Sequence, residues 1–423
     1  MIKILSIISL YICLISESLL FSQEVEYPAW EIGVMELHHI STGRGDAAFY
    51  IFPDGTTLLV DAGDTSETHP RTMTNRNVPL LPNRSKTAPE WIVDYITQFF
   101  PKNKPLQLDY ALMTHYHDDH FGEIDSTRVL FNKGNYALTG ITEVGHLLPI
   151  KTLLDRGSDF PLNLKNSLVQ ESLSKNDTYK MISTLKNYWN FIEYHSQHNG
   201  LKHEILEVGS KNQISLKNEA KKYSNFSVQN IAVNGKIWTG EKQEYFNLFK
   251  EGEYPGENSL STCIKITYGK FDYFTGGDIS GVNEFGESDF DRVESHIAPV
   301  VGPVDVATLN HHGNRDSQNS YYVRTIRPRV WIGQTWSSDH PGNNVLRRLL
   351  SKKLYPRKRD LFSTAMLQAN KDVIGELMDK YKSLSGHIVV RVYANGDKYD
   401  VYVLNENSEK REVKAKYGPY ESR

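Results

Sequence analysis

Cysteine is nearly absent from this chain. Its 423 residues include 2 cysteines, Cys13 and Cys263. Cys13 falls in an apolar N-terminal segment, so Cys263 is left alone in the rest of the chain and cannot form an internal disulfide. A lone thiolate also excludes zinc sites built from several cysteines. Any bound metal must therefore be held by histidines and carboxylates.

Neither sign of charge dominates, and long apolar runs are scarce. Lys and Arg number 48 against 51 Asp and Glu, which gives a formal net charge of -3. This balance excludes a global electrostatic attraction to nucleic acid, so recognition of phosphate would have to be local. The apolar run from Ile4 to Ile15 is too short to span a bilayer as a permanent anchor.

The N-terminus has the order of a secretory signal peptide. Lys3 supplies a positive charge, Ile4 to Ile15 supplies the apolar core, and the small residues Ser16, Ser18 and Ser22 follow. We therefore expect residues 1–22 to be removed and the chain to be exported to the periplasm or the cell exterior, without a stable membrane anchor. The alternative is a buried N-terminal strand or helix.

Short strands separated by tight turns follow. Residues 47–52 and 56–60 are typical of a hairpin around Pro53-Asp54-Gly55. Further strands are expected at residues 35–40, 108–114, 260–268, 270–275, 305–310, 329–333, 387–393 and 398–404, and helices at 91–100 and 177–194. Strands interleaved with helices are typical of an α/β fold in which two mixed sheets stack between helices.

The composition divides the chain into a main domain and two additions. We expect the main domain over residues 27–350. Residues from about 146 to 225 are rich in Lys, Asn and Ser, and they predict a helical insertion that lies over the core as a lid. Residues 351–423 predict an extension made of a helix and a β-hairpin, whose turn is Asn395-Gly396.

The segment His115-Tyr116-His117-Asp118-Asp119-His120 is the strongest functional signal. It directly follows a predicted buried strand. Two histidines spaced by one residue on an extended segment point the same way, so both imidazoles can meet one ion. A turn immediately afterwards can direct Asp119 and His120 to a second ion. Such a donor set suits zinc and accepts manganese or iron.

Two later fragments would complete such a site. Asp278 follows Gly276-Gly277 at the end of a predicted strand, where a carboxylate can bridge two cations. His311-His312 follows the strand predicted at residues 305–310. Either fragment alone is also compatible with an ordinary turn. Their position after predicted strands favours ligands.

These residues resemble the metallo-β-lactamase superfamily. Its pattern is an early Asp after a hairpin, HxHxDH, a bridging Asp and a late His. Within it, the chain looks most like the hydrolase domain of ComEC-type DNA-uptake proteins and its secreted relatives. The fragments that carry this closer resemblance are Gly43-Arg44-Gly45-Asp46-Ala47, Leu58 to Gly63, Asn258-Ser259-Leu260-Ser261, His311-His312-Gly313, and His340-Pro341 with Val345 to Leu349.

The resemblance implies an αββα four-layer sandwich with the metal site at one edge, between the sheets. His115 and His117 would hold the first metal, and Asp119 and His120 the second. Asp278 would bridge them, and Asp61 would fix the loop that presents the ligands. Either member of the His311-His312 pair would complete the second site, and we assign His311. The superfamily often adds a third His to the first metal, for which the candidates are His146 and His340.

The resemblance also implies a mechanism. Two zinc ions about 3.5–4 Å apart would lower the pKa of a bridging water and give a hydroxide nucleophile. Asp119 would orient this hydroxide and carry a proton. His312 or His340 would bind the substrate or act as general acid.

The motifs do not by themselves determine the substrate. By analogy the resemblance favours phosphodiester bonds, in nucleic acid or in a phosphorylated cell-surface group. A run of seven positive charges from Arg347 to Arg359 could grip phosphates, although a solvated helix face explains it equally well. The alternatives are hydrolysis of an ester, lactone or β-lactam, and a metal-stabilised binding protein without catalysis.

Overall fold

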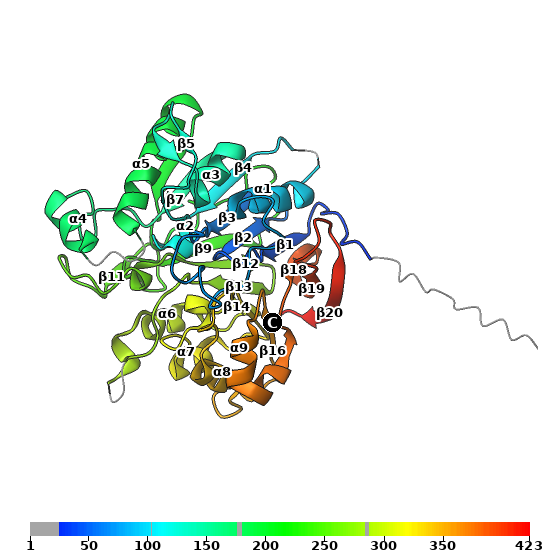
Figure 1. Ribbon diagram of the computed structural model, residues 1–423. Helices are drawn as coiled ribbons and strands as arrows, with labels where there is room; N and C mark the ends of the chain where they lie inside the picture. The colour runs from blue at the N-terminus through cyan, green and yellow to red at the C-terminus, as the bar shows by residue number, and fades with distance from the viewer. Residues whose placement is uncertain (1–24, 103, 176–179, 284–286) are drawn as a thin grey trace, which may run out of the picture.

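The computed structural model describes residues 25–102, 104–175, 180–283 and 287–423. The expected signal peptide, residues 1–22, lies outside these ranges. Two nine-stranded sheets face each other, and helices cover both outer faces (Figure 1). The fold is thus the αββα sandwich expected from the sequence. Within the described ranges, no helix has the length and apolarity needed to cross a bilayer.

The first sheet has the strand order β20-β19-β18-β1-β2-β3-β4-β7-β8. Its strands, in chain order, are β1 (Met35–His39), β2 (Ala47–Ile51), β3 (Thr57–Ala62), β4 (Leu108–Leu112), β7 (Ile150–Asp155), β8 (Lys202–Ile205), β18 (His387–Val392), β19 (Lys398–Leu404) and β20 (Val413–Glu421). Strands β1, β2 and β3 pair antiparallel, whereas β3, β4, β7 and β8 pair parallel.

The second sheet has the order β11-β10-β9-β12-β13-β14-β15-β16-β17. Its strands are β9 (Phe226–Val233), β10 (Lys236–Trp238), β11 (Tyr245–Asn247), β12 (Cys263–Tyr268), β13 (Phe271–Thr275), β14 (Val306–Thr308), β15 (Val330–Gly333), β16 (Asp360–Ser363) and β17 (Tyr381–Ser383). Strands β13 to β17 run parallel. A separate hairpin joins β5 (Leu130–Phe131) and β6 (Tyr136–Ala137).

Local sequence signals set the helix ends. Helix α1 begins with a capping box, in which Thr87 Oγ1 accepts from Glu90 N at 3.2 Å and Glu90 Oε2 accepts from Thr87 N at 2.7 Å. Helix α1 covers Ala88–Phe99. It is followed along the chain by α2 (Asp118–Phe121), α3 (Gly140–Leu147), α4 (Ser167–Ser174), α5 (Met181–His198), α6 (Val293–Val301), α7 (Ser320–Ile326), α8 (Asn343–Leu350) and α9 (Gln368–Ile374). Short 3₁₀ turns include η1 (Asn258–Leu260) and η3 (Asn310–Gly313).

Alternation of side chains along the strands builds three apolar layers. In β2, Phe49 and Ile51 pack toward α1, α3 and α5, whereas Ala48 and Tyr50 face the second sheet. A third layer joins the second sheet to α6, α7 and α8. Each fully buried large apolar side chain contributes about 1.5–3 kcal/mol. The two-sided burial of both sheets therefore stabilises the four-layer arrangement.

The region expected as a helical insertion is only partly helical. It contains α4 and α5, but it also contains β7 and β8, which extend the first sheet by parallel pairing from β4. No strand signal marks β8 in the sequence, because all four of its residues are exposed and so show no alternation of buried and exposed positions. β7 is mostly buried but short, and it lies in a region whose overall composition is polar.

The residues after position 350 supply strands to both sheets. β16 and β17 continue the second sheet, and β18 pairs antiparallel with β1 in the first. The expected hairpin is present as β18 and β19, and β20 adds a third strand at the edge. β20 was not predicted, since it contains Gly418 and Pro419, which weaken strand signals and are tolerated at a sheet edge.

Candidate metal centre

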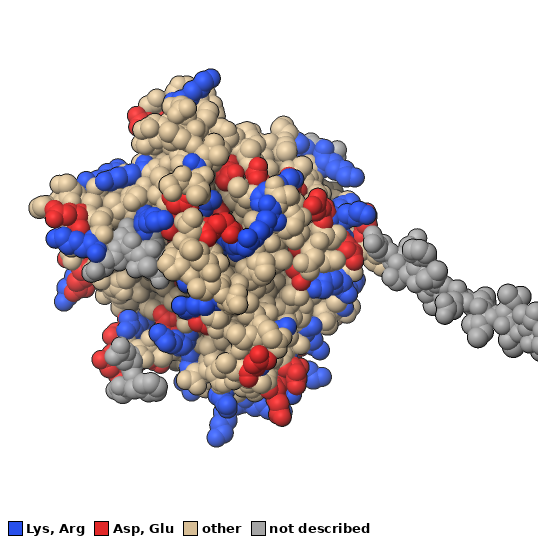
Figure 2. Space-filling model, viewed as in Figure 1, with Lys and Arg blue, Asp and Glu red and all other residues tan. Residues whose placement is uncertain are grey.

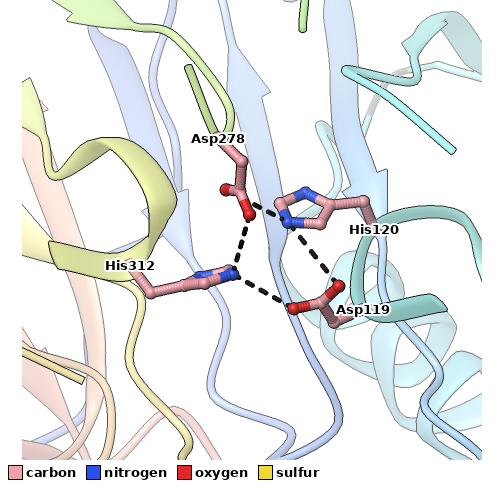
Figure 3. A group of neighbouring side chains, drawn as sticks. All are labelled: Asp119, His120, Asp278 and His312. Atoms are coloured by element: carbon pink, nitrogen blue, oxygen red, sulfur yellow. Dashed lines mark hydrogen bonds and ion pairs between the residues drawn. The ribbon is translucent and has the colours of Figure 1, made fainter. Parts of the chain in front are cut away.

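Four buried side chains meet at one edge of the sandwich. Asp119 and His120 lie in α2, just after β4 of the first sheet, whereas Asp278 follows β13 and His312 lies in η3, after β14 of the second. Each offers one ligand atom, and these atoms all lie within 4.8 Å of one another. Figure 3 shows the four side chains pointing toward a common centre. The group thus joins the two sheets.

The spacing of these atoms fits a metal ion. His312 Nε2 lies 3.1 Å from Asp119 Oδ2 and 3.3 Å from Asp278 Oδ2. His120 Nε2 lies 3.3 Å from Asp278 Oδ1 and 4.0 Å from Asp119 Oδ1. Ligands at about 2.0–2.2 Å from zinc stand roughly 3.4 Å apart at the corners of a tetrahedron. The side chains could therefore close on an ion with small movements.

Two atoms of this group are buried without a hydrogen bond. Across the described part of the chain, neither His120 Nε2 nor Asp278 Oδ1 has a partner in hydrogen-bond geometry, although the two atoms face each other at 3.3 Å. Leaving a buried polar atom unsatisfied costs about 1–3 kcal/mol. A cation between the two atoms would satisfy both. Two imidazoles and two carboxylates are also ligands that zinc, iron and manganese accept.

His115 and His117 lie beside this group, directly after β4. His115 Nε2 lies 3.2 Å from His117 Nδ1 and 3.9 Å from Asp278 Oδ2. The rings of His115 and His120 are 4.1 Å apart between centroids. We call His115, His117 and Asp278 the first half-site, and Asp119, His120, Asp278 and His312 the second half-site. Asp278 is common to both.

Asp61 lies behind His120. Its Oδ2 is 2.8 Å from His120 Nδ1, and its Oδ1 accepts from Thr114 N at 2.7 Å. The Thr114 hydroxyl donates to Asp61 Oδ2 at 2.7 Å. A carboxylate on the far nitrogen of a ligand imidazole fixes its orientation and tautomer. Asp61 thus directs His120 Nε2 toward Asp119 and Asp278.

Asp46 lies behind His312 at ion-pair distance and was not predicted. Its Oδ1 lies 2.9 Å from His312 Nδ1, which also lies 3.0 Å from Gln334 O. The sequence signal that could have identified Asp46 is its position between a glycine-rich turn and β2, in the fragment Gly43-Arg44-Gly45-Asp46-Ala47. Its role depends on His312, which is far away in the sequence.

Two glycines bring the backbone of Asp119 into place. A Cβ atom on Gly45 would lie 2.1 Å from Asp119 O, and one on Gly63 would lie 2.2 Å from it. The Asp46 amide donates to Asp119 O at 2.8 Å. Only glycine allows this close approach. The loops after β1 and β3 therefore hold α2 at its ligand residues.

The structure exchanges the positions that we assigned to His311 and His312. His312, not His311, belongs to the four-residue group. Both residues have a left-handed backbone, with φ of +48° and +54°. This uncommon turn directs His312 inward, while His311 Nδ1 lies 2.6 Å from Asp316 Oδ1 and its ring is 18% exposed. Sequence spacing could not separate the two, because the choice depends on these dihedral angles.

His340 lies beside the second half-site. Its ring stacks on that of His312 with centroids 4.4 Å apart and an interplanar angle of 25°. Its Nε2 lies 3.7 Å from Asp339 Oδ1, and its Nδ1 is buried with no hydrogen-bond partner among the residues that the structure describes. The structure thus places His340 against a ligand rather than in the group.

His146 is packed against aromatic residues of the β5–β6 hairpin. It lies in α3, where its Nδ1 is 3.0 Å from Tyr136 Oη and its ring is 4.8 Å from that of Phe131. Burial lowers its pKa. The structure does not bring this expected extra ligand to the first half-site, since its side chain packs against the β5–β6 hairpin instead.

The charges in the group attract one another more strongly than burial opposes them. Burial lowers the pKa of His120, but Asp278, Asp61 and Asp119 raise it well above its usual value. Burial raises the pKa of Asp278, but the histidines, led by His120 and His312, hold it well below the usual range. In the absence of a cation, the carboxylates thus retain protons on the imidazoles. A divalent cation would replace these protons.

Comparisons with known proteins give distant structural similarities. No family model and no curated protein match the sequence. A mutant of the β-hydroxylase CmlA aligns with TM-score 0.37 and 12% identity, over 87% of this chain and 55% of that one. A diphosphatase from the PhnP family aligns with TM-score 0.33 and 9% identity, over 85% and 97%. The hydrolase AbOPH, in the β-lactamase superfamily, aligns with TM-score 0.33 and 11% identity, over 61% and 75%.

These similarities are too distant to carry an argument about activity. The chain also spans only 55% of the length of the β-hydroxylase. The chemistry of the site must therefore be argued from its own residues.

Proposed function

We propose that this chain is a metal-dependent hydrolase that binds two zinc ions and cleaves phosphodiester bonds. The observation that carries the proposal is the meeting of Asp119, His120, Asp278 and His312 from both sheets. Purely structural zinc sites have four closed ligands, whereas this group adjoins a second histidine pair at His115 and His117. An adjoining pair of half-sites favours catalysis over a structural role.

The two half-sites divide the ligands between the ions. His115 and His117 would hold one ion, and Asp119, His120 and His312 the other, with Asp278 serving both. Bound zinc supplies Lewis acidity, which polarises the oxygens of the scissile group and makes a water acidic enough to attack near neutral pH. The residues around the ligands would orient the water, bind the substrate and transfer protons.

The position of His311 suits it for proton transfer. Its Nδ1 lies 2.6 Å from Asp316 Oδ1, and its Nε2 lies 3.1 Å from Asn258 Nδ2. The same Nε2 is 3.9 Å from Asp278 Oδ2, so the ring stands at the border of the group and is partly open to solvent. A carboxylate behind an imidazole orients it for acid–base work. We assign His311 to carry a proton to the leaving group.

Asp119 and His340 have supporting roles in this proposal. Asp119, whose Oδ2 lies 3.1 Å from His312 Nε2, would help to hold an ion and would orient the attacking water. His340, stacked on His312, presents a buried Nδ1 that can donate to a substrate oxygen.

The position of Arg71 supports the proposal that the substrate is anionic. Its guanidinium lies over the ring of Trp336, 5.2 Å from the centroid, and Nη2 is 3.6 Å from Asp118 Oδ1. Trp336 in turn contacts the ring of His312, with centroids 5.8 Å apart. Trp336 thus lies between Arg71 and a ligand of the second half-site, and a planar guanidinium suits a phosphodiester oxygen. The ComEC-like sequence fragments favour the same bond.

The basic run from Arg347 to Arg359 gives less support. Arg348 donates to Gln318 O at 2.6 Å, and Arg359 donates to Leu349 O at 2.7 Å, so these two cations hold backbone loops. On the face seen in Figure 2, basic and acidic side chains are interspersed, without a broad area of one sign. A small phosphodiester is therefore favoured over a long polyanion held across that face.

The test combines metal content with turnover. The purified chain is assayed for zinc, manganese and iron, and for hydrolysis of bis-(p-nitrophenyl) phosphate and a p-nitrophenyl ester. We expect about two zinc ions per chain, and a loss of phosphodiester turnover of about 100-fold or more in Asp119→Ala and Asp278→Ala. As a control, Asp305→Ala removes a buried carboxylate outside the metal centre and should retain both the bound zinc and the phosphodiester turnover. Absence of bound metal, or turnover indifferent to both substitutions, would overturn the proposal.

Export is proposed from the sequence of residues 1–22 alone. The expected result is a mature chain that begins within a few residues of Gln23 and is found outside the cytoplasm. Mass spectrometry of the intact protein from cell fractions tests it. A full-length chain retained in the cytoplasm would contradict export.

A further inference from the structure

Two buried charged residues outside the ligand set hold the segment between His115 and His117. Glu257 and Arg156 are each 1% exposed. Arg156 Nε donates to Glu257 Oε1 at 2.6 Å, and Nη2 donates to Oε2 at 2.7 Å. Oε1 also accepts from Tyr116 N at 2.9 Å. The carboxylate thus ties the backbone of the ligand segment to a bidentate arginine.

Glu257 is not itself placed as a ligand. Tyr254 Oη donates to its Oε2 at 3.1 Å, so each carboxylate oxygen already accepts two hydrogen bonds. Arg156 neutralises its charge at close range. The side chain is therefore fully occupied in holding other groups.

Arg156 contacts Tyr116 from another direction. Its Cζ lies 4.4 Å from the centroid of the tyrosine ring, and Tyr116 Oη donates to Gly157 O at 3.2 Å. The ring packs against Phe121 and Tyr188. Because side chains alternate on an extended segment, Tyr116 points away from the side to which its neighbouring histidines point. A shift of its backbone would move both imidazoles together.

The residues that follow Glu257 reach the other ligand loops. Asn258 Nδ2 lies 3.1 Å from His311 Nε2. Ser261 Oγ accepts from Asp278 N at 3.1 Å. One short segment is therefore bonded to all three loops that carry ligands.

We propose that the Glu257–Arg156 pair is a positioning device that sets the zinc affinity of the first half-site. The inference rests on the proposed function, since it assumes that His115 and His117 bind metal. A buried ion pair is costly to desolvate and is often no more stabilising than apolar residues of the same size. Its connection to Tyr116 gives this pair a role in geometry instead. Groups that orient ligands typically change metal affinity by about 10–100-fold when they are replaced.

The experiment uses Glu257→Gln, Arg156→Met, their combination, and the milder Arg156→Lys. A matched control is available in Glu36, which is also buried, pairs with Arg391 and accepts from Tyr27 Oη at 3.0 Å. Glu36→Gln breaks a similar cluster in β1, outside the ligand loops. Zinc affinity is measured by competition with a chelator, and the geometry of each half-site by the absorption spectrum of the cobalt-substituted protein.

We expect one of two zinc ions to bind about 10–100-fold more weakly in Glu257→Gln and Arg156→Met, while the other ion and the Glu36→Gln protein are unaffected. The double variant should lose less than the sum of the single losses, because both act on one contact. Arg156→Lys should be intermediate, since lysine cannot form the bidentate pair.

Equal affinity and equal cobalt spectra in wild type and in all Glu257 and Arg156 variants would overturn the inference. A wild-type protein that binds no metal would instead overturn the proposed function, so the two failures are distinguishable. Thermal unfolding is compared with that of Glu36→Gln. If Glu257→Gln does not fold, Arg156→Lys decides the outcome through its cobalt spectrum.

Discussion

The imidazole of His312 is held with Nδ1 2.9 Å from Oδ1 of Asp46. This contact leaves its Nε2 toward Asp119 and Asp278. Asp61 stands behind His120 in a comparable way, where it forms a hydrogen bond, and Asp46 and Asp61 lie on either side of the β2–β3 hairpin. The hairpin therefore supplies an orienting carboxylate to a ligand from each sheet.

Replacement of Asp46 should weaken metal binding without removing a ligand. We expect Asp46→Asn and Asp46→Ala to lower zinc affinity at the second half-site by about 10–100-fold, because His312 loses the carboxylate that fixes its ring. Chelator competition measures the change. Asp316→Ala, which removes the equivalent partner of His311, should retain both zinc ions. Unchanged affinity in both Asp46 variants would contradict the orienting role.

The two adjacent histidines should respond differently to substitution. We expect His312→Ala to lose the zinc of the second half-site. His311→Ala should keep two zinc ions but lower phosphodiester kcat by about 10²–10⁴-fold, because it removes a proton donor. Metal analysis and steady-state kinetics on the same preparations separate the two effects. Loss of zinc in His311→Ala alone would restore the assignment that we made from the sequence.

Zinc affinity should rise with pH through the neutral range. In the metal-free protein, neighbouring carboxylates raise the pKa of His120 and His312 well above the usual value despite burial. Zinc must displace a proton from each ring, so binding releases protons and strengthens as pH increases. Each released proton gives up to about a tenfold change in affinity per pH unit. Calorimetry in buffers of different ionisation enthalpy counts the protons, and an affinity that falls with pH would contradict this account.

Substrate charge should determine the effect of replacing Arg71. If its guanidinium binds a phosphodiester oxygen, Arg71→Ala should raise KM for bis-(p-nitrophenyl) phosphate by about tenfold, in line with the loss of one charged hydrogen bond. Its effect on a neutral p-nitrophenyl ester should be small. Equal effects on both substrates would indicate that Arg71 serves only to pack on Trp336.

His387 should make the fold sensitive to acid. Burial lowers its pKa to about 4, and its Nδ1 accepts from Ser41 N at 3.0 Å. Because the folded pKa lies below the unfolded value of about 6.5, the unfolded state takes up a proton first as pH falls. The free energy of unfolding should then decrease between about pH 6.5 and pH 4, by roughly 3 kcal/mol in all.

The matched variant for this prediction is His387→Asn. Its Oδ1 can accept the same hydrogen bond from Ser41 but does not titrate. Urea denaturation at several pH values should show a shallower decline in this variant than in wild type, by about one proton. Parallel pH profiles of the two proteins would show that His387 does not contribute.

Much of this protein follows from local sequence patterns. Alternating apolar residues around Pro53-Asp54-Gly55 predict the β2–β3 hairpin, and the cluster from His115 to His120 predicts where metal ligands gather. Both depend on residues that are neighbours in the chain, so their geometry is set by backbone alternation and turn chemistry. The order of such elements suggests two mixed sheets between helices, and the resemblance to metallo-β-lactamases implies the αββα class.

Tertiary structure decided the rest, because the remaining relations join residues that are far apart in the chain. The pairing of β7 with β4 and of β8 with β7 depends on parallel crossovers, and the partners of His312, Asp46 and Glu257 lie in other loops. The choice of His312 over His311 depends on two left-handed backbone φ angles, and packing against the β5–β6 hairpin keeps His146 out of the site. A short motif encodes which side chains can bind metal, but only long-range packing determines which of them share one centre.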